Sequence, residues 1–125
     1  MTDEDAIRNT IARFCQHLDS RRFVEWSETF TQDGVFNKLN GRAAILDMIL
    51  GGELATRPEL RRQHAVTNSI IDVTGDTATA TSDLAMYDRI DDGPISVKTG
   101  RYYDRLARQA DGDWLFTQRR LEWFG

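Results

Sequence analysis

The stretch that decides the fold is RRQHAVTN, residues 61–68, because the hydrophobic period of the chain changes there. Upstream, apolar residues recur about every 3.6 positions, as in helices; downstream they alternate, as in strands. His64 opens the first predicted long strand and shares one face with Val66 and Asn68. If that face is buried, the imidazole requires a hydrogen-bond partner.

The first helix supplies a candidate partner, Asp19. Thr2 is placed to cap this helix, and three acidic residues follow it at the positive end of the helix dipole. Apolar residues then recur at steps of four, three and four: Ile7, Ile11, Phe14 and Leu18. Asp19 lies at the edge of this stripe near the helix C-terminus, where the dipole disfavours a carboxylate. We therefore expect Asp19 to contact His64, the alternative being a solvated carboxylate in the last turn.

The remaining pattern predicts an α+β domain spanning residues 1–125. A second helix carries Phe23, Trp26 and Phe30 on one face and ends at the Asp33-Gly34 turn. A short strand begins at residues 35–36, and a third helix lies between two glycine-containing turns at 40–41 and 51–52. A loop continues to Glu59. Four long strands follow, over about 64–73, 77–87, 95–107 and 114–123. Three N-terminal helices packed in a curved, mostly antiparallel sheet would form a cone with an apolar interior.

Composition excludes several classes of function. The net charge of −4 and the mixing of acidic and basic residues argue against nucleic acid and against an anionic membrane surface. No apolar run is long enough to span a bilayer and the N-terminus is acidic, so a cytoplasmic location is the default expectation. The single cysteine, Cys15, cannot form an internal disulfide. Three adjacent arginine pairs are interpreted as solvated surface, at 21–22, 61–62 and 119–120. The last pair lies on a predicted strand, where its two side chains face opposite ways.

The chain resembles the SnoaL-like branch of the nuclear-transport-factor-2-like superfamily, which has a cystatin-like cone fold. The resemblance covers nearly the whole sequence. It is carried by Leu18-Asp19 with Phe23 and Trp26, and by these segments: FTQDGVF (30–36), QHAVTN (63–68), GDTA (75–78), GRYYD (100–104) and DGDW (111–114). Such patterns are specific for the fold and less specific for chemistry, because the superfamily hosts many functions.

Within this superfamily the polar residues are most similar to those of scytalone dehydratase, bile-acid dehydratases and a dehydrochlorinase. Those enzymes pair an Asp at the end of the first helix with a His opening the second strand, and Asp19 and His64 fall on these positions. The resemblance implies that the His is the base for an elimination and that the Asp orients it. Two positions depart from scytalone dehydratase: Leu18 stands where it has a Tyr, and Tyr87 falls near its second His.

The dyad has a physical rationale of its own. A carboxylate that binds one ring nitrogen of His64 fixes the tautomer and stabilises the imidazolium, while the other nitrogen faces a substrate. The alternative is a purely structural pair that holds helix to sheet. Further candidates for substrate binding are the polar side chains Tyr102, Tyr87 and Asn68 and the pocket-wall residues Trp26 and Phe36. Motifs for a metal or a nucleotide cofactor are absent, so we expect neither.

Three functions remain open. The first is a cofactor-independent lyase or isomerase of dehydratase type, acting on a small hydrophobic or cyclic molecule. The second is another enzyme on the same cone, such as a polyketide cyclase or an epoxide hydrolase. The third is a non-catalytic ligand-binding or assembly module. An open pocket containing His64 favours the first two, and an interior sealed by aromatic side chains favours the third. We also expect a homodimer formed through the outer faces of the long strands, on the premise that this face is apolar.

Overall fold

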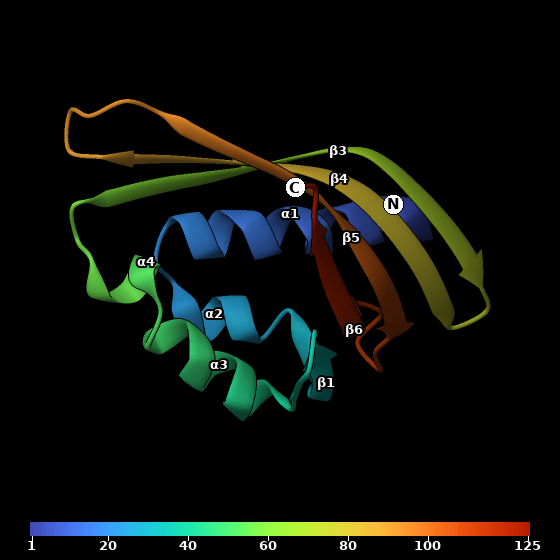
Figure 1. The fold of residues 1–125 in the computed structure, drawn as a ribbon. Coiled ribbons are helices and arrows are strands. Elements are labelled where there is room, and N and C mark those ends of the chain that lie inside the picture. The colour runs from blue at the N-terminus through green and yellow to red at the C-terminus, as the bar shows by residue number, and fades with distance from the viewer.

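The computed structural model describes all 125 residues, Met1–Gly125, as four helices on one side of a strongly curved six-stranded sheet (Figure 1). The fold is α+β, with the helices packed against a curved, mostly antiparallel sheet, as predicted. The helices are α1 (Asp3–Asp19), α2 (Phe23–Ser27), α3 (Arg42–Leu50) and α4 (Glu53–Thr56). The strands are β1 (Phe30–Phe36), β2 (Leu39–Asn40), β3 (Leu60–Thr74), β4 (Thr77–Ile90), β5 (Ser96–Arg108) and β6 (Trp114–Trp123). None of the helices combines the length and apolarity needed to cross a membrane.

The helical half confirms the predicted start of α1 and corrects two boundaries. The Thr2 hydroxyl accepts a hydrogen bond from the Asp5 backbone N–H at 3.1 Å, which caps α1. The second helix ends at Ser27 rather than at the turn after Phe30, and Phe30 already belongs to β1. The predicted loop before Glu59 contains α4, a single helical turn that makes the helices four instead of three.

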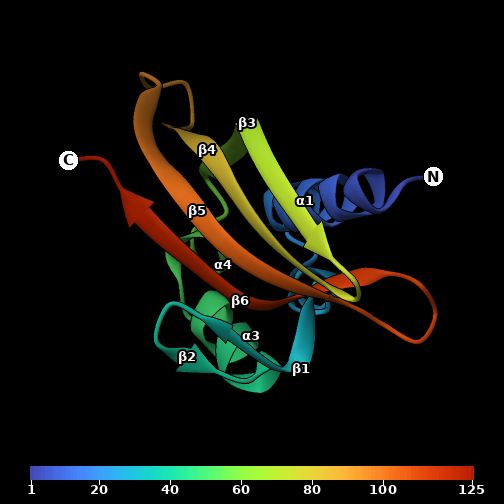
Figure 2. The same cartoon turned by 90° about the vertical axis from the view of Figure 1, so that its right-hand side faces the viewer.

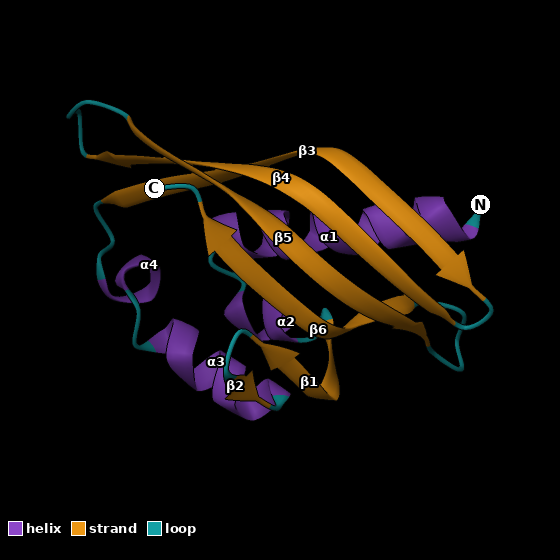
Figure 3. Ribbon diagram, turned by 45° about the vertical axis from the view of Figure 1, so that its right-hand side comes forward, coloured by secondary structure: helices purple, strands orange, loops and turns teal.

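The strands are arranged in the order β2-β1-β6-β5-β4-β3, so β3 lies at one free edge of the sheet (Figure 3). The four long strands form an antiparallel meander, and β1 adds to β6 in parallel. The helix α1 packs beside β3, and in Figure 2 it lies on the side of β3 that faces away from β4. The C-terminus of α1 and the first half of β3 are thereby brought together, which is the condition for a contact between Asp19 and His64.

A two-residue bulge interrupts the pairing of β3 with β4. Asn68 and Ser69 together stand opposite the single residue Ser82, and Asn68 has a positive φ of 52°. The bulge reverses the alternation of side chains. Asn68 therefore faces solvent, where it donates a hydrogen bond to Asp83, and it does not share the inner face of His64 as the sequence predicted. Ser69 takes the inner position.

The interior of the cone is filled by aromatic rings around Phe14 of α1. Its ring centroid lies 5.4–6.1 Å from those of five other aromatic side chains: Trp26, Phe30, Phe36, Tyr102 and Phe116. Predominantly edge-on contacts of this kind stabilise beyond the area they bury. The aromatic part of the cone is therefore packed core.

An ion pair is buried within this aromatic core. The Arg119 guanidinium donates to Asp104 at 2.8 and 3.2 Å, and both side chains are completely buried. The same guanidinium lies 3.5 Å from the ring centroid of Tyr102 and 4.4 Å from that of Phe116. Its third nitrogen, Nη1, has no hydrogen-bond partner. The interpretation of residues 119–120 as solvated surface was therefore wrong for Arg119.

The other two arginine pairs are also only half solvated. Arg62 forms a bidentate pair with Asp88, described below. Arg21, which has a positive φ of 58°, directs its guanidinium to the backbone carbonyls of Leu54, Arg57 and Leu60. These bonds attach the end of α1 to α4 and to the start of β3. One member of each arginine pair thus has a structural role, because its guanidinium holds two separate segments of the chain together.

The outer face of the long strands is polar, contrary to the premise of the predicted dimer. Along β4 and β5 this face has exposed Tyr87 and Val97 near one end and otherwise carries mainly threonines and charged side chains: Thr77, Thr79, Thr81, Asp83, Arg101 and Arg105. Asp83 and Arg101 form an ion pair there at 2.8 Å. This region therefore has no extensive apolar face for a second copy of the chain to bury. The homodimer stays a prediction, and light scattering at micromolar concentration tests it.

The buried ion pair leads to a prediction about stability. Arg119→Met should lower the free energy of unfolding by about 3–5 kcal/mol, because it leaves the Asp104 carboxylate buried without a partner. The double variant Arg119→Met/Asp104→Leu should recover much of this loss, since both charges are then removed. Urea denaturation followed by circular dichroism measures the effect.

Arg120→Met is the matched control for this experiment, because Arg120 is the neighbouring arginine and pairs with Glu122 in solvent. Its removal should cost at most about 1 kcal/mol. Equal losses for the two single variants would contradict the assigned role of Arg119.

Candidate active site

Asp19 and His64 form a two-point contact, which confirms the predicted meeting of the two residues. Asp19 is the last residue of α1, and His64 is the fifth residue of β3. The Asp19 Oδ2 atom accepts the His64 backbone N–H at 2.9 Å, and Oδ1 lies 2.5 Å from His64 Nδ1. One carboxylate therefore binds both the backbone and the ring of the same residue, which restricts the rotation of the imidazole.

This contact assigns the tautomer of the neutral imidazole. An ionised carboxylate is only an acceptor, so Nδ1 carries the hydrogen and donates it to Asp19. The other ring nitrogen, Nε2, then has a free lone pair, and it makes no hydrogen bond to the protein. The His64 side chain is only 6% exposed and that of Asp19 19%, so their hydrogen bond is largely shielded from water. His64 is thereby prepared to accept a proton at Nε2.

His64 lines a pocket of about 360 Å³ between α1 and β3. The α1 side is formed by Arg8, Ile11, Ala12, Cys15, Gln16 and Asp19, and the β3 side by Gln63, His64, Val66 and Ser69. This volume lies in the range of small-molecule sites. The pocket lies at the free edge of the sheet, while the aromatic cone behind it is packed.

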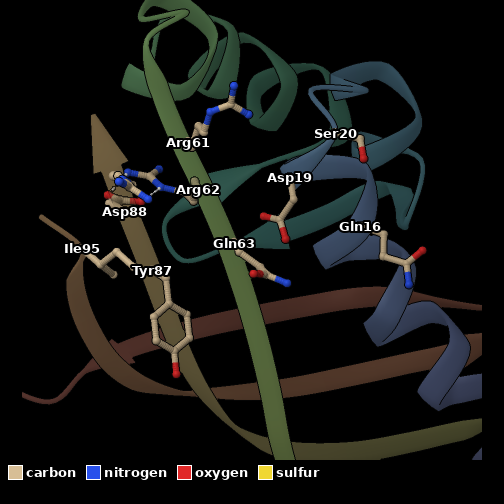
Figure 4. A pocket seen from close by; sticks show the side chains of 10 residues that line it. Gln16, Asp19, Ser20, Arg61, Arg62, Gln63, Tyr87, Asp88 and Ile95 are labelled. Atoms are coloured by element: carbon tan, nitrogen blue, oxygen red, sulfur yellow. Dashed lines mark hydrogen bonds and ion pairs between the residues drawn. The ribbon is translucent and has the colours of Figure 1, made fainter. Parts of the chain in front are cut away.

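A second pocket, of about 580 Å³, adjoins the first and shares Gln16, Asp19 and Gln63 with it. Figure 4 shows that β3 passes between its two sides, with Asp19, Ser20 and Gln16 on one side and Tyr87 and Ile95 on the other. Asp19 is thus accessible from both pockets. His64 lines only the smaller one, which is therefore the candidate reaction chamber.

Arg62 and Asp88 form a further polar pair beside Asp19. Arg62 donates to the two Asp88 oxygens at 2.8 and 2.9 Å, and this bidentate bond raises the pKa of the guanidinium. Both residues line the larger pocket. The pair was missed by sequence reasoning because the register of β3 on β4 depends on the bulge. Counted from the Thr74–Thr77 pairing without a bulge, Arg62 would stand opposite Arg89.

The other predicted site residues are dispersed. Trp26 and Phe36 belong to the aromatic core, and Tyr102 is buried against Arg119, where desolvation raises the pKa of its phenol. Asn68 faces solvent. Tyr87, which is 40% exposed, lines the larger pocket but not the one that contains His64. Sequence reasoning thus predicted the contact of Asp19 with His64, whereas four of its five proposed substrate-binding residues line neither of these two pockets. The pocket of His64 is lined by one side of α1 and the edge of β3.

No group of three or more His, Cys, Asp or Glu side chains is placed to hold a metal ion. The polar groups that line the pocket of His64 are its imidazole, the Asp19 carboxylate, a guanidinium, a thiol, and neighbouring amide and hydroxyl groups.

The sequence as a whole places the chain in a known family. Residues 1–120 match the model of the SnoaL-like domain, and the chain belongs to this family. No curated protein sequence matches it. Among solved structures, a Catenulispora acidiphila protein in complex with S-DNPA is 29% identical, with a TM-score of 0.85 over 96% of this chain and 92% of that one.

Two more distant structures share the fold. ActVI-ORFA from Streptomyces coelicolor has a TM-score of 0.86 at 23% identity, over 96% of this chain and 93% of that one. A protein from Novosphingobium aromaticivorans that is proposed to be a scytalone dehydratase has a TM-score of 0.84 at 23% identity, over 98% of this chain and 85% of that one. The predicted family and its cystatin-like fold are thus confirmed, and at these identities the likeness shows the fold alone.

Cys15 provides a test of the pocket's electrostatics. Burial raises the pKa of its thiol to about 11, so roughly one thiol in a thousand is ionised at pH 8. We expect alkylation by iodoacetamide to be slow at pH 8 and to accelerate as the pH rises towards 10. Mass spectrometry of timed samples measures the rate, with the urea-unfolded chain as a fast-reacting control. A thiol that reacts as fast in the folded chain as in the unfolded one contradicts this environment.

Proposed function

We propose that the protein is a cofactor-independent lyase or isomerase that uses His64 as its base and Asp19 to orient it. The observation that supports this most is the double hydrogen bond from one carboxylate to the backbone and Nδ1 of His64, which leaves Nε2 free in a pocket. General bases need this combination of a fixed tautomer and an accessible lone pair.

The reaction that fits is an elimination. Nε2 takes a proton from a carbon next to an electron-withdrawing group such as a carbonyl, and the new imidazolium is stabilised by Asp19. The bond to a β-hydroxyl group then breaks, a carbon–carbon double bond forms, and the imidazolium returns its proton so that hydroxide leaves as water. Returning the same proton to another carbon instead would move a double bond. Both outcomes need one group that accepts and releases a proton.

The substrate proposed for this site is a small, predominantly hydrophobic molecule. Ile11, Ala12, Cys15 and Val66 supply an apolar lining between polar ends. The Catenulispora acidiphila protein, which has the same fold, was solved with the small ligand S-DNPA. Cyclisation of a polyketide would use the same proton abstraction but form a carbon–carbon bond, so the products separate it from elimination.

A non-catalytic ligand-binding or assembly module is the second candidate, and the packed aromatic interior favours it. In that case the Asp19–His64 pair holds α1 to the edge of the sheet and has no chemical task. The two functions differ in what the loss of His64 would change: turnover in an enzyme, and only stability or ligand affinity in a module.

The proposal predicts a specific pattern of kinetic losses. On a substrate found by screening β-hydroxycarbonyl compounds for formation of a conjugated product, His64→Ala should abolish nearly all turnover. Asp19→Asn should lower kcat by two orders of magnitude or more with a smaller change in KM, because the lost interaction stabilises the transition state. The double variant should be scarcely worse than His64→Ala, since the two residues act as one unit.

Matched controls are available within the chain. His17→Ala removes the only other histidine, and Asp72→Asn neutralises an exposed carboxylate on β3. Both should retain turnover. A folded His64→Ala variant that remains fully active rules out the proposed mechanism, and the pair is then a structural link.

A further inference from the structure

The pocket of His64 is a groove with two polar ends. The helix α1 and the strand β3 lie side by side and run in opposite directions (Figures 1 and 3). Asp19 and His64 therefore lie at one end, while Arg8 and Ser69 lie at the other. Residues 8, 12, 15, 16 and 19 share one side of α1 by their helical spacing, so they line the groove along its length.

The length of the groove follows from the two elements that form it. Arg8 and Asp19 are eleven residues apart on a helix, which corresponds to about 16 Å at 1.5 Å per residue. His64 and Ser69 are five residues apart on a strand, which corresponds to at most about 16 Å and somewhat less across the bulge. Both walls thus place the far polar end well beyond hydrogen-bond reach of His64. A substrate that contacts both ends must be elongated.

Ser69 is directed into the groove by the bulge in β3. The positive φ of Asn68 shifts the alternation so that Ser69 turns inward, and its Oγ lies 2.8 Å from Ser82 Oγ. Two hydroxyls that bond to each other use one of their two hydrogens, so one hydrogen is left to donate elsewhere. Ser82 is buried, whereas Ser69 lines the pocket. Bulges commonly re-aim a side chain beside an active site.

Arg8 supplies a cation at the same end. Its nearest carboxylate is Asp5 at 4.0 Å, and 54% of the Arg8 side chain is exposed. The guanidinium is therefore free to pair with another anion, in contrast to the bidentate pairing of Arg62 with Asp88. The far end thus combines an exposed cation with a hydroxyl pair, a set of donors that suits a carboxylate.

We propose that Arg8 and Ser69 form an anchoring subsite for a carboxylate at the end of the substrate remote from the reacting carbon. The substrate class is then an elongated, apolar ring compound. One end carries the group that gives its proton to His64, such as an acidified C–H, and the other end carries a carboxylate that binds Arg8. This inference rests on the proposed function for the choice of the reacting end. The subsite itself is independent of turnover, because it concerns affinity.

Isothermal titration calorimetry with 4′-hydroxybiphenyl-4-carboxylate as the probe tests the subsite. Its hydroxyl can donate to Nε2 of His64 while its carboxylate reaches Arg8. Arg8→Gln should weaken binding about two- to fivefold, as for a half-exposed ion pair, and Ser69→Ala about three- to tenfold, as for the loss of one hydrogen bond. Arg105→Gln, which removes the same charge from the outer face of β5, should bind as the wild type does.

Two further ligands separate the ends of the groove. Biphenyl-4-ol lacks the carboxylate, so its affinity should not change in Arg8→Gln. The shorter 4-hydroxybenzoate cannot span the groove, so it should bind the wild type at least about tenfold more weakly than the probe does. A thermal melt of each variant establishes that it is folded.

The subsite is overturned if folded Arg8→Gln and Ser69→Ala bind the probe as tightly as the wild type, or if the wild type shows no binding at millimolar probe. Neither result affects the dyad, whose own test is the loss of turnover in His64→Ala. Conversely, if His64→Ala retains turnover while Arg8→Gln weakens the probe, the groove is a ligand site without the proposed chemistry.

Discussion

The two hydrogen bonds from His64 to the Asp19 carboxylate connect the end of the first helix to the free edge of the sheet. An edge strand exposes unpaired backbone groups, and here one of these, the His64 N–H, is bound by a side chain from α1. The same carboxylate lies at the C-terminal end of a helix, where the dipole disfavours it. Two donors from a single residue offset this cost and fix the imidazole beside the pocket.

The bulge in β3 determines which side chains share the site with this pair. Its two residues opposite Ser82 shift the register of β3 on β4 by one position, so that Arg62 pairs with Asp88 and His64 stands beside Met86. Without the shift, Arg62 would stand beside Arg89, and two like charges would oppose each other across the strands. The bulge therefore assembles the ion pair beside Asp19, and it also turns Ser69 into the groove.

The parts of the structure that depend on local rules were predictable from the sequence. The start of α1 follows from the Thr2 cap. The contact of Asp19 with His64 follows from two positions: Asp19 lies at the edge of the apolar stripe of the first helix, and His64 lies near the start of the first long strand. Phe30 was assigned to a helix because its spacing from Trp26 is helical. In the structure, Thr29 bonds back to Trp26 and its carbonyl accepts from Phe116, so pairing with β6 overrides the local pattern.

Other features depend on contacts between distant segments, which spacing alone does not show. Asn68 was assigned to the inner face because strict alternation contains no bulge. Arg119 was assigned to the surface because two adjacent arginines do not make a basic stripe, although the two face opposite ways on a strand. Its burial requires Asp104 from the neighbouring strand together with the rings of Phe14 and Tyr102. The candidate site was thus predictable as a pair of residues but not as a pocket, since the residues that line the pocket depend on the register of β3 on β4.

The central claim is that Asp19 holds His64 as the tautomer with a free Nε2, and this can be measured without a substrate. Long-range ¹H–¹⁵N correlation spectra of the histidine rings distinguish the two nitrogens at neutral pH. The account predicts a protonated Nδ1 and an unprotonated Nε2 for His64 in the wild type. In Asp19→Asn, where the amide can donate to Nδ1, the proton should move to Nε2. A wild-type ring already protonated at Nε2, or a tautomer unchanged by Asp19→Asn, would contradict the account.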